Sequence, residues 1–182
     1  MSARQAGTVE RLLAAGGEEL RAVGAETLTI RTVAGRAGVS AATAYTYFAS
    51  KNHLYAELFW RFLAEDDHEP TGDGATARLQ SVTRHLAARL AAAPELAAAV
   101  TPALLGTDPD VERLRLRIGA DLVDRFRRAL AGPDRVADPD LVEAVALAFS
   151  GALLQAGMGL MTYTEMGERL DAVVATIMRG NA

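Results

Sequence analysis

The apolar residues of this chain recur at three- and four-residue intervals, which is the spacing of an amphipathic helix. The segment 111–130 is the hardest case, because its opening letters "VERLRLRI" alternate as a strand would. Over the whole segment, one helical face accounts for the apolar residues Val111, Leu114, Ile118, Leu122, Phe126 and Leu130. No other alternating pattern persists, so the sequence predicts an all-α fold.

Breaks in this pattern divide the chain into three parts. Proline and glycine, which interrupt helices, gather at four places: "HEPTGDG" (68–74), Pro94, "GTDPD" (106–110) and "GPDRVADP" (132–139). We expect a first domain of short helices over 1–50, a connecting helix over 51–67 and a larger helical bundle over 68–182.

Capping residues support two helices of the bundle. Asp138 followed by Pro139 is typical of an N-cap and the first helical position. Thr162 stands three residues before Glu165, which is the spacing of a capping box. The helix that follows has an apolar face made of Met166, Leu170, Val173, Val174 and Ile177.

One stretch invites comparison with a membrane span. No residue between Glu143 and Glu165 is charged, and that length is enough to cross a bilayer. The stretch is mainly Ala and Gly, contains Gln155 and lacks the Lys or Arg that flank real spans. We interpret it as a helix covered on one side by its own bundle and on the other by a second copy of the chain, with no membrane partner. The residues expected at this homodimer interface are Gly151, Leu154, Gly157, Val174 and Ile177.

Composition excludes several kinds of chemistry. The 182 residues carry a formal net charge of -4, and half of them are hydrophobic, as in ordinary globular proteins. There is no cysteine, which excludes disulfides, thiol catalysis and thiolate metal sites and fits a reducing compartment. The first apolar run, "MSARQAGTVERLL", carries charges and does not fit a signal peptide. We therefore expect a cytoplasmic protein.

The stretch "TIRTVAGRAGVSAATAYTYFASK" (29–51) departs from this acidic balance, because it holds three basic residues and no acid. Thr29 is placed to cap a first helix, and Gly38 allows the sharp turn after it. Ser40 is placed to cap a second short helix over 41–47. This order is that of a helix-turn-helix.

The second helix of this stretch suits a nucleic-acid partner. Its two leading alanines leave the N-terminus open to a flat surface, and the free N–H groups there favour phosphate. Tyr45 and Tyr47 add hydroxyl donors, and Lys51 adds a positive charge. Such a helix enters the major groove of DNA with its N-terminal residues at the base edges. We interpret the basic, acid-free stretch as a local DNA-binding surface of an acidic chain. Packing in the hydrophobic core would explain Tyr45 and Phe48 as well.

The segment "TIRTVAGRAGVSAATAYTYFASKNHL" resembles the DNA-binding segment of the TetR family of bacterial transcriptional regulators. The likeness covers about Leu12 to Leu58 and rests on the threonine-capped helix, Ala-Gly-Val-Ser, the tyrosine-rich second helix and Ser-Lys. Beyond it only the all-α layout agrees. The resemblance implies an N-terminal three-helix helix-turn-helix DNA-binding domain and a C-terminal helical bundle for ligand binding and dimerisation.

The resemblance also implies roles for individual residues. It brings Arg31 to a base edge or a neighbouring phosphate, and Ala41, Ala42 and Thr43 to the major groove. With two alanines at the groove, direct base readout rests on Arg31 and Thr43, and DNA shape supplies the rest. The residues assigned to the DNA backbone are Thr29, Tyr45, Tyr47 and Lys51.

Ser40 and Thr46 complete the expected interface. Three positions depart from the pattern of the resembling family. Ala41 stands where lysine is frequent, Thr46 where an aromatic residue is common, and Tyr47 where histidine is common.

Aromatic and methionine residues form a candidate ligand pocket. In "LFWRF" (58–62), Phe59, Trp60 and Phe62 cannot share one helix face, and core packing explains them as well as a pocket does. The candidate pocket residues are Phe59, Phe62, His85, Phe126, Phe149, Met158 and Met161. Their chemistry predicts a small apolar or amphipathic ligand. The resemblance implies a homodimeric repressor that such a ligand releases from an inverted-repeat operator in double-stranded DNA.

Other chemistry has weaker support. "EDDHE" (65–69) has residue types that bind divalent ions, but a solvated acidic helix end explains it, so we expect no metal and no cofactor. Neither a nucleophile motif nor a phosphate-binding glycine loop is present, so we do not expect an enzyme. Two alternatives remain open. One is an all-α small-molecule-binding protein whose helix-turn-helix does not bind DNA, and the other is a helical hydrolase or metalloenzyme built on "EDDHE" and His85.

Overall fold

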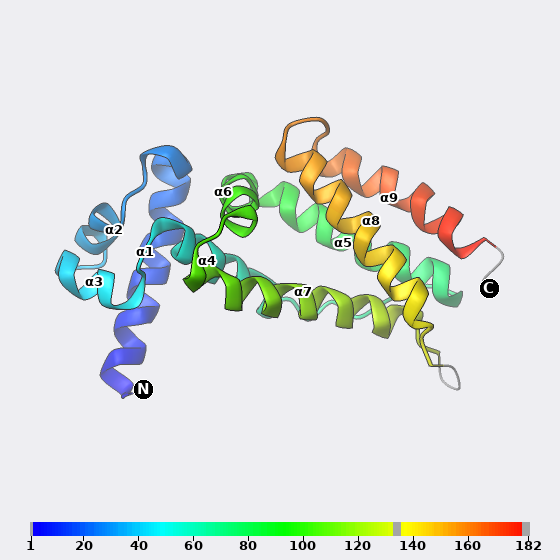
Figure 1. Cartoon of the computed structure of the whole chain (residues 1–182), viewed down its shortest axis with the longest axis horizontal. Helices are drawn as coiled ribbons and strands as arrows, with labels where there is room; N and C mark the ends of the chain where they lie inside the picture. Colours follow the sequence, from blue (N-terminus) through cyan, green and yellow to red (C-terminus); the bar gives the residue numbers. More distant parts are fainter. Residues whose placement is uncertain (1, 133–135, 180–182) are drawn as a thin grey trace. The chain divides into compact units, whose positions relative to one another are not determined.

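The computed structural model of this chain describes residues 2–132 and 136–179, which form nine helices and no β-strand (Figure 1). The helices are α1 (Ala3–Thr27), α2 (Ile30–Arg36), α3 (Ala41–Tyr47), α4 (Lys51–Ala64), α5 (Gly74–Ala92), α6 (Pro94–Leu105), α7 (Pro109–Leu130), α8 (Pro139–Gly157) and α9 (Tyr163–Met178). The all-α prediction is confirmed. So are the two predicted caps, since Asp138 accepts a hydrogen bond from the Asp140 N–H and Thr162 forms a capping box with Glu165.

The first helix is longer than the short helices predicted for this part of the chain, so that prediction is wrong for α1. It spans 25 residues. Gly24 interrupts it with a left-handed backbone of φ 74°, a conformation that costs glycine little. The Leu28 N–H then bonds to the Gly24 carbonyl at 3.2 Å, and the chain turns towards α2.

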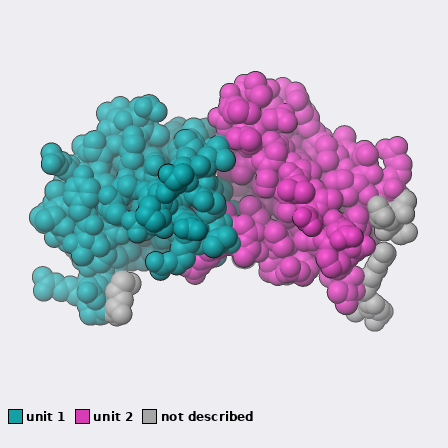
Figure 2. Space-filling view, viewed as in Figure 1, with its two compact units in different colours: residues 1–65, 94–116 teal, residues 66–93, 117–182 magenta. Residues whose placement is uncertain are grey.

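Contacts divide the chain into two compact units, which Figure 2 shows in different colours. The first unit holds residues 1–65 and 94–116, and the second holds 66–93 and 117–182. Helix α6 and the first turns of α7 therefore group with the N-terminal helices, although they follow α5 in the chain. The units follow packing and not function, so the predicted DNA-binding, connecting and ligand-binding domains stay a prediction.

The first unit is built on α1, which contacts α2, α4 and α6. A Cβ at Gly16 would stand 3.2 Å from both Leu54 methyl carbons, so glycine there lets α1 approach α4. A Cβ at Gly17 would meet only the Arg21 side chain, at 4.0 Å. The buried core of this unit includes Leu12, Leu13, Leu20, Leu28, Ile30, Val33, Ala34, Ala44, Phe48, Leu54 and Tyr55.

The second unit packs α9 against α5 and α8, and α5 and α9 lie side by side in Figure 1. Gly167 permits the close approach, because a Cβ there would stand 3.2 Å from the Ala87 Cβ. Two polar contacts join the same helices: Arg84 Nε donates to Asp171 Oδ2 at 2.7 Å, and Gln80 Nε2 donates to the Asp171 carbonyl at 3.0 Å. The buried face of α9 is made of Met166, Leu170, Val174 and Met178.

Helix α8 is apolar on more sides than its own unit covers. Val142, Val145 and Phe149 are buried, whereas the Leu147 side chain is 67% exposed. Among the described residues, the helix Pro139–Gly157 is long and apolar enough to cross a membrane. Helices that pack against other helices inside soluble proteins have the same length and composition.

One predicted interface residue needs correction. Val174 is only 1% exposed, so it belongs to the core between α9 and its neighbours and is not available to a second copy. Its neighbour Val173 is 39% exposed. The other four predicted interface residues are exposed (Gly151, Leu154 and Gly157) or half-buried (Ile177).

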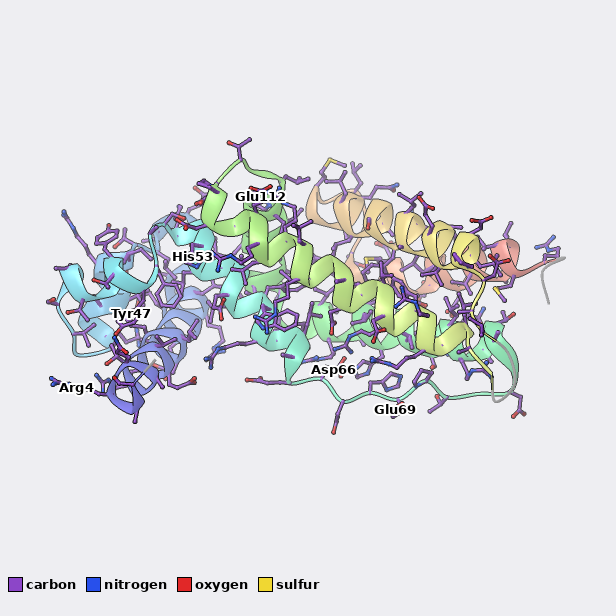
Figure 3. The ribbon with its side chains drawn as sticks, turned by 60° about the horizontal axis from the view of Figure 1, so that its bottom comes forward. Arg4, Tyr47, His53, Asp66, Glu69 and Glu112 are labelled. Atoms are coloured by element: carbon purple, nitrogen blue, oxygen red, sulfur yellow. The ribbon has the colours of Figure 1, made fainter. Side chains whose placement is uncertain are left out.

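The acidic segment 65–69 is also corrected, because Asp66 is not solvated. Its side chain is 5% exposed and accepts hydrogen bonds from Arg125 Nη1 at 2.5 Å and from His85 Nε2 at 2.7 Å. Arg89 Nη1 lies 3.4 Å from it, and the His68 ring stacks on His85 with centroids 4.0 Å apart. Figure 3 labels Asp66 at the start of this segment. Asp66 thus ties the segment after α4 to α5 and α7.

Candidate nucleic-acid interface

Helices α2 and α3 both begin at residues that cap them. Thr29 Oγ1 accepts from the Thr32 N–H at 3.1 Å, and Thr32 Oγ1 accepts from the Thr29 N–H at 3.2 Å. Ser40 Oγ accepts from the Thr43 N–H at 3.1 Å. These side chains satisfy amide groups that a helix start leaves without partners. The caps that the sequence predicts at Thr29 and Ser40 are confirmed.

The turn between the two helices depends on Gly38, whose φ is 67°. The Val39 N–H reaches back to the Ala34 carbonyl at 3.0 Å, and the Ala37 N–H bonds to the Val33 carbonyl at 2.9 Å. Helices commonly end at a glycine with a left-handed backbone conformation and hydrogen bonds of this kind. It directs the chain from α2 into α3, so the helix-turn-helix is present.

The residues predicted to face DNA form a largely exposed surface of the first unit. Seven are exposed, Thr29, Arg31, Ser40, Ala42, Tyr45, Thr46 and Lys51, and three are half-buried, Ala41, Thr43 and Tyr47. Tyr45 is 47% exposed, whereas Phe48 is buried, so only Phe48 is a core residue. Tyr47, labelled in Figure 3, packs partly against the core of the unit.

The three basic residues of the stretch 29–51 differ in their partners. Arg36 is paired, since its Nε and Nη2 lie 2.8 Å from Glu19 Oε2. Lys51 Nζ donates to the Ala25 carbonyl at 3.2 Å. Arg31 is exposed and has no hydrogen-bond or ion-pair partner among residues 2–132 and 136–179. The charge that is available to a polyanion is therefore concentrated at Arg31, with Lys51 second.

Several hydroxyl groups on this surface already have partners within the chain. Thr46 Oγ1 donates to the Ala42 carbonyl at 3.0 Å. Thr43 Oγ1 and Ser40 Oγ share a hydrogen bond of 2.8 Å. A hydroxyl keeps acceptor capacity when it donates once, so Thr43 can still accept from a base, but it is held by Ser40.

The start of α4, directly after the helix-turn-helix, is held on one side by α7. Ser50 Oγ accepts from the His53 N–H at 3.0 Å, which caps α4, and donates to Asp108 Oδ2 at 2.5 Å. The hydrogen bond from Ser50 is the main reason why the pKa of Asp108 lies below its usual value. The sequence marks "GTDPD" only as a break, because the partner of Asp108 lies 58 residues away.

The start of α4 is also held by the end of α1. The Ala25 carbonyl accepts from Tyr55 Oη at 2.9 Å as well as from Lys51 Nζ. Burial, and secondly the charge of Glu26, raises the pKa of Tyr55 to about 12, so its hydroxyl remains a donor. Sequence reasoning assigned Lys51 to phosphate contact alone and did not predict this structural bond.

The candidate ligand-pocket residues are distributed over both units. Phe59 and Phe62 stack in the first unit, with ring centroids 5.8 Å apart. In the second unit Phe126 and Phe149 are buried against each other at 5.4 Å, His85 binds Asp66, and Met161 is nearly buried.

Met158 is exposed just after the end of α8, which corrects its assignment to a pocket lining. A groove of about 360 Å³ lies between the end of α7 and the start of α8, and none of the predicted pocket residues line it. Among the described residues, no three acidic or histidine side chains are grouped so as to hold a metal ion.

Known proteins match both the helix-turn-helix and almost the whole chain. Residues 12–58, which hold the helix-turn-helix, match the family described as bacterial regulatory proteins, tetR family. An HTH-type transcriptional regulator of Mycobacterium bovis is 45% identical over 184 residues, which cover 97% of this chain and 83% of that protein. An HTH-type transcriptional regulator of Mycobacterium tuberculosis matches to the same extent.

Solved structures share the fold over almost the whole chain. A TetR transcriptional regulator from Rhodococcus sp. RHA1 matches with a TM-score of 0.81 at 18% identity, over 98% of this chain and 97% of that one. FadR from Thermus thermophilus, described as a TetR-family repressor in complex with lauroyl-CoA, matches with a TM-score of 0.64 at 20% identity. That match covers 93% of this chain and 94% of that one.

Proposed function

Because this chain belongs to the TetR family of bacterial regulatory proteins, we propose that it is a ligand-responsive homodimeric repressor that binds an inverted-repeat DNA operator in the cytoplasm. The family consists of DNA-binding transcriptional regulators and not of enzymes, which argues against the hydrolase and metalloenzyme alternatives. The observation that carries the DNA-binding part is an exposed Arg31 that has no hydrogen-bond or ion-pair partner in the described part of the chain. It lies on a capped helix-turn-helix whose stretch 29–51 contains no acid.

The proposed contacts fall into two classes. Arg31 and Thr43 read base edges, because the Arg31 donors meet no acceptor among the described residues and Thr43 lies in the first turn of α3. The backbone class consists of Thr29, Ser40, Tyr45, Thr46, Tyr47 and Lys51, whose hydroxyl and ammonium groups suit phosphate. Ala41 and Ala42 let α3 approach the groove closely. Arg36 is left out, because Glu18 and Glu19 already neutralise it.

The test separates the two classes on a duplex that the wild-type protein selects from a random-sequence pool, compared with a scrambled duplex. Lys51→Ala should weaken binding to both duplexes equally, because phosphates carry no sequence information. It should also lower the slope of log affinity against log salt concentration by about one for each helix-turn-helix, because one counterion fewer is released there. Arg31→Ala should instead cost about 1–3 kcal/mol on the selected duplex and much less on the scrambled one. Arg21→Ala, which removes an exposed arginine of α1, is the control.

Two outcomes would contradict this assignment. If Arg31→Ala loses the same proportion of affinity for both duplexes, Arg31 contacts the backbone and does not read bases. If the wild-type protein enriches no duplex at all, the helix-turn-helix does not bind DNA, and the chain is the small-molecule-binding alternative.

The homodimer rests on the uncovered apolar face of α8 and α9. Leu147, Gly151 and Leu154 of α8 and its C-cap residue Met158 are exposed at three- and four-residue spacing. Val173 and Ile177 add exposed or half-buried apolar surface on α9, which packs against α8. A second copy that presents the same face would cover this surface by two-fold symmetry. We therefore keep the predicted helices in the interface and replace Val174 by Val173.

The ligand is proposed to be small and apolar or amphipathic and to bind in the second unit. The aromatic pair Phe126 and Phe149, with Met161 and the polar His85, supplies the kinds of side chain that line such sites. A fold relative is described in complex with lauroyl-CoA, so acyl-CoA thioesters and free fatty acids are the first compounds to test. A compound that raises the melting temperature and weakens binding to the selected duplex supports ligand control. A compound that raises the melting temperature but leaves DNA affinity unchanged contradicts it.

A further inference from the structure

The hydrogen bond between Ser50 and Asp108 joins the residues that directly precede two helices, α4 and α7, which are far apart in the chain. Ser50 is the N-cap of α4, and its hydroxyl donates to Asp108. Asp108 stands at the start of α7, where its second carboxylate oxygen accepts from the Asp110 N–H at 3.0 Å and its carbonyl accepts from the Val111 N–H at 3.1 Å. One carboxylate therefore orders the start of α7 and holds the start of α4.

This contact is close to the recognition helix α3 along the chain. Only residues 48 and 49 separate the end of α3 from Ser50, and Phe48 is buried in the core of the unit. Lys51 and Tyr55, in the first turns of α4, bond to the Ala25 carbonyl near the end of α1. The segment between α3 and α4 is thus bonded both to the end of α1 and, through Ser50, to the start of α7.

A second set of contacts links α4 to α7 further along α4. Ala56 is fully buried with Val111 and Leu114 of α7, and Trp60 packs against this cluster. Trp60 is the only tryptophan of the chain, so its fluorescence reports on the packing of α4 against α7. Figure 3 labels His53 on α4 and Glu112 in the first turn of α7.

We propose that Asp108 is a positioning residue for DNA binding, which holds α3 in its DNA-competent placement through the hydroxyl of Ser50. Helix α7 contributes residues to both compact units, so a change of the bundle part of α7 has a continuous helical route to this bond. Neither residue needs to touch DNA for this role. The proposal rests on the DNA binding proposed above and adds the residue through which the rest of the chain acts on the recognition helix.

The chain contains a matched control, because the letters Asp-Pro-Asp occur twice. Asp138 begins α8 as Asp108 begins α7, and it accepts from the Asp140 N–H at the same 3.0 Å. Asp138 is exposed and has no hydrogen-bond or ion-pair partner on another helix of the described chain. Asp108→Ala and Asp138→Ala both lose a helix cap, and only Asp108→Ala also loses the link to α4.

The test measures affinity for the selected duplex, melting temperature and Trp60 emission in the full-length variants. Both alanine variants should lose thermal stability, and Asp108→Ala should lose more, because it also breaks the hydrogen bond to Ser50. Only Asp108→Ala should bind the duplex about tenfold more weakly, which is the effect of one hydrogen bond to a charged group. Only Asp108→Ala should change the Trp60 emission. If both variants bind DNA equally well, Asp108 is merely a cap and the proposal is wrong.

Variants of Ser50 test the same bond from its other end. Ser50→Gly removes the hydroxyl but leaves a residue that helix N-caps accept, so α4 is retained. It should weaken DNA binding about tenfold, as Asp108→Ala does, and the double variant should be no weaker than either single variant. Ser50→Thr keeps the hydroxyl and should bind as the wild type does. Fully additive losses in the double variant would overturn the proposal.

These outcomes separate this inference from the proposed function. A wild-type protein that selects no duplex refutes DNA binding itself. A wild-type protein that binds, while Asp108→Ala and Asp138→Ala behave alike, refutes only the positioning role.

Discussion

Replacement of Asp66 by asparagine should destabilise the second unit, because Asp66 balances buried positive charge. The side chains of Asp66 and Arg125 are 5% and 7% exposed, and their ion pair is 2.5 Å long. Removing one partner from a buried ion pair costs about 3–5 kcal/mol when the other charge is left alone. Arg125 keeps Asp121 at 2.7 Å, so we expect a smaller loss, of about 2 kcal/mol.

The assay is thermal unfolding followed by circular dichroism at neutral pH. For a chain of this length, 1 kcal/mol corresponds to about 2–4 °C, so Asp66→Asn should melt about 4–8 °C below the wild type. The matched control is Asp67→Asn, since Asp67 is exposed and has no hydrogen-bond or ion-pair partner among the described residues. If Asp66→Asn and Asp67→Asn melt at the same temperature, the reasoning from burial is wrong.

The pH dependence of this difference gives a second test. Burial alone raises the pKa of Asp66, but the hydrogen bond from His85 and the charges of Arg125 and Arg89 together bring it below its usual value. The folded state therefore favours the ionised carboxylate. Its stabilisation is present above the unfolded pKa of about 3.9 and is lost as the pH falls through the lower folded value. The difference in melting temperature between the wild type and Asp66→Asn should thus be large at pH 7 and should diminish as the pH falls below about 4.

Two further predictions concern α8 and α1. Leu147→Glu should shift the protein from dimer to monomer in analytical ultracentrifugation. The control Leu116→Glu, at a leucine of α7 that is 69% exposed, should not. If Leu147→Glu remains a dimer, the interface lies elsewhere. Gly17→Ala should raise the melting temperature by about 2–4 °C, because alanine is favoured over glycine by about 1 kcal/mol within a helix and its Cβ meets no atom closer than 4.0 Å. Gly16→Ala should gain less or lose stability, because its Cβ would press on Leu54, and equal gains at both positions would contradict this packing argument.

Local chemistry explains why the helix-turn-helix was predictable from the sequence. The caps at Thr29 and Ser40 and the turn at Gly38 depend on partners at most five residues away. Side-chain type and spacing therefore carry the information directly. The exposure of most residues proposed to face DNA follows from the same spacing, whereas the bond from Lys51 to Ala25, which lies 26 residues away, does not.

Distant partners explain what the sequence could not predict. Acids at the end of a helix are usually solvated, and nothing near Asp66 announces Arg125, which lies 59 residues further along the chain. Helical spacing placed both Val173 and Val174 on one broad apolar face of α9. Only the packed structure separates Val174, in the core, from Val173, at the surface, because periodicity does not say which neighbour covers which residue.

The first turn of α3 begins with two alanines, Ala41 and Ala42, and this has a consequence for how such a regulator changes over evolutionary time. Ala41 and Ala42 contribute little to holding α3, which depends on the Ser40 cap and on the buried Ala44 and Phe48. New side chains at positions 41 and 42 would therefore meet few constraints from folding while altering the surface that we propose meets DNA. The two positions are a natural starting point for drift towards a new set of controlled genes, and for laboratory selection of variants with altered preference.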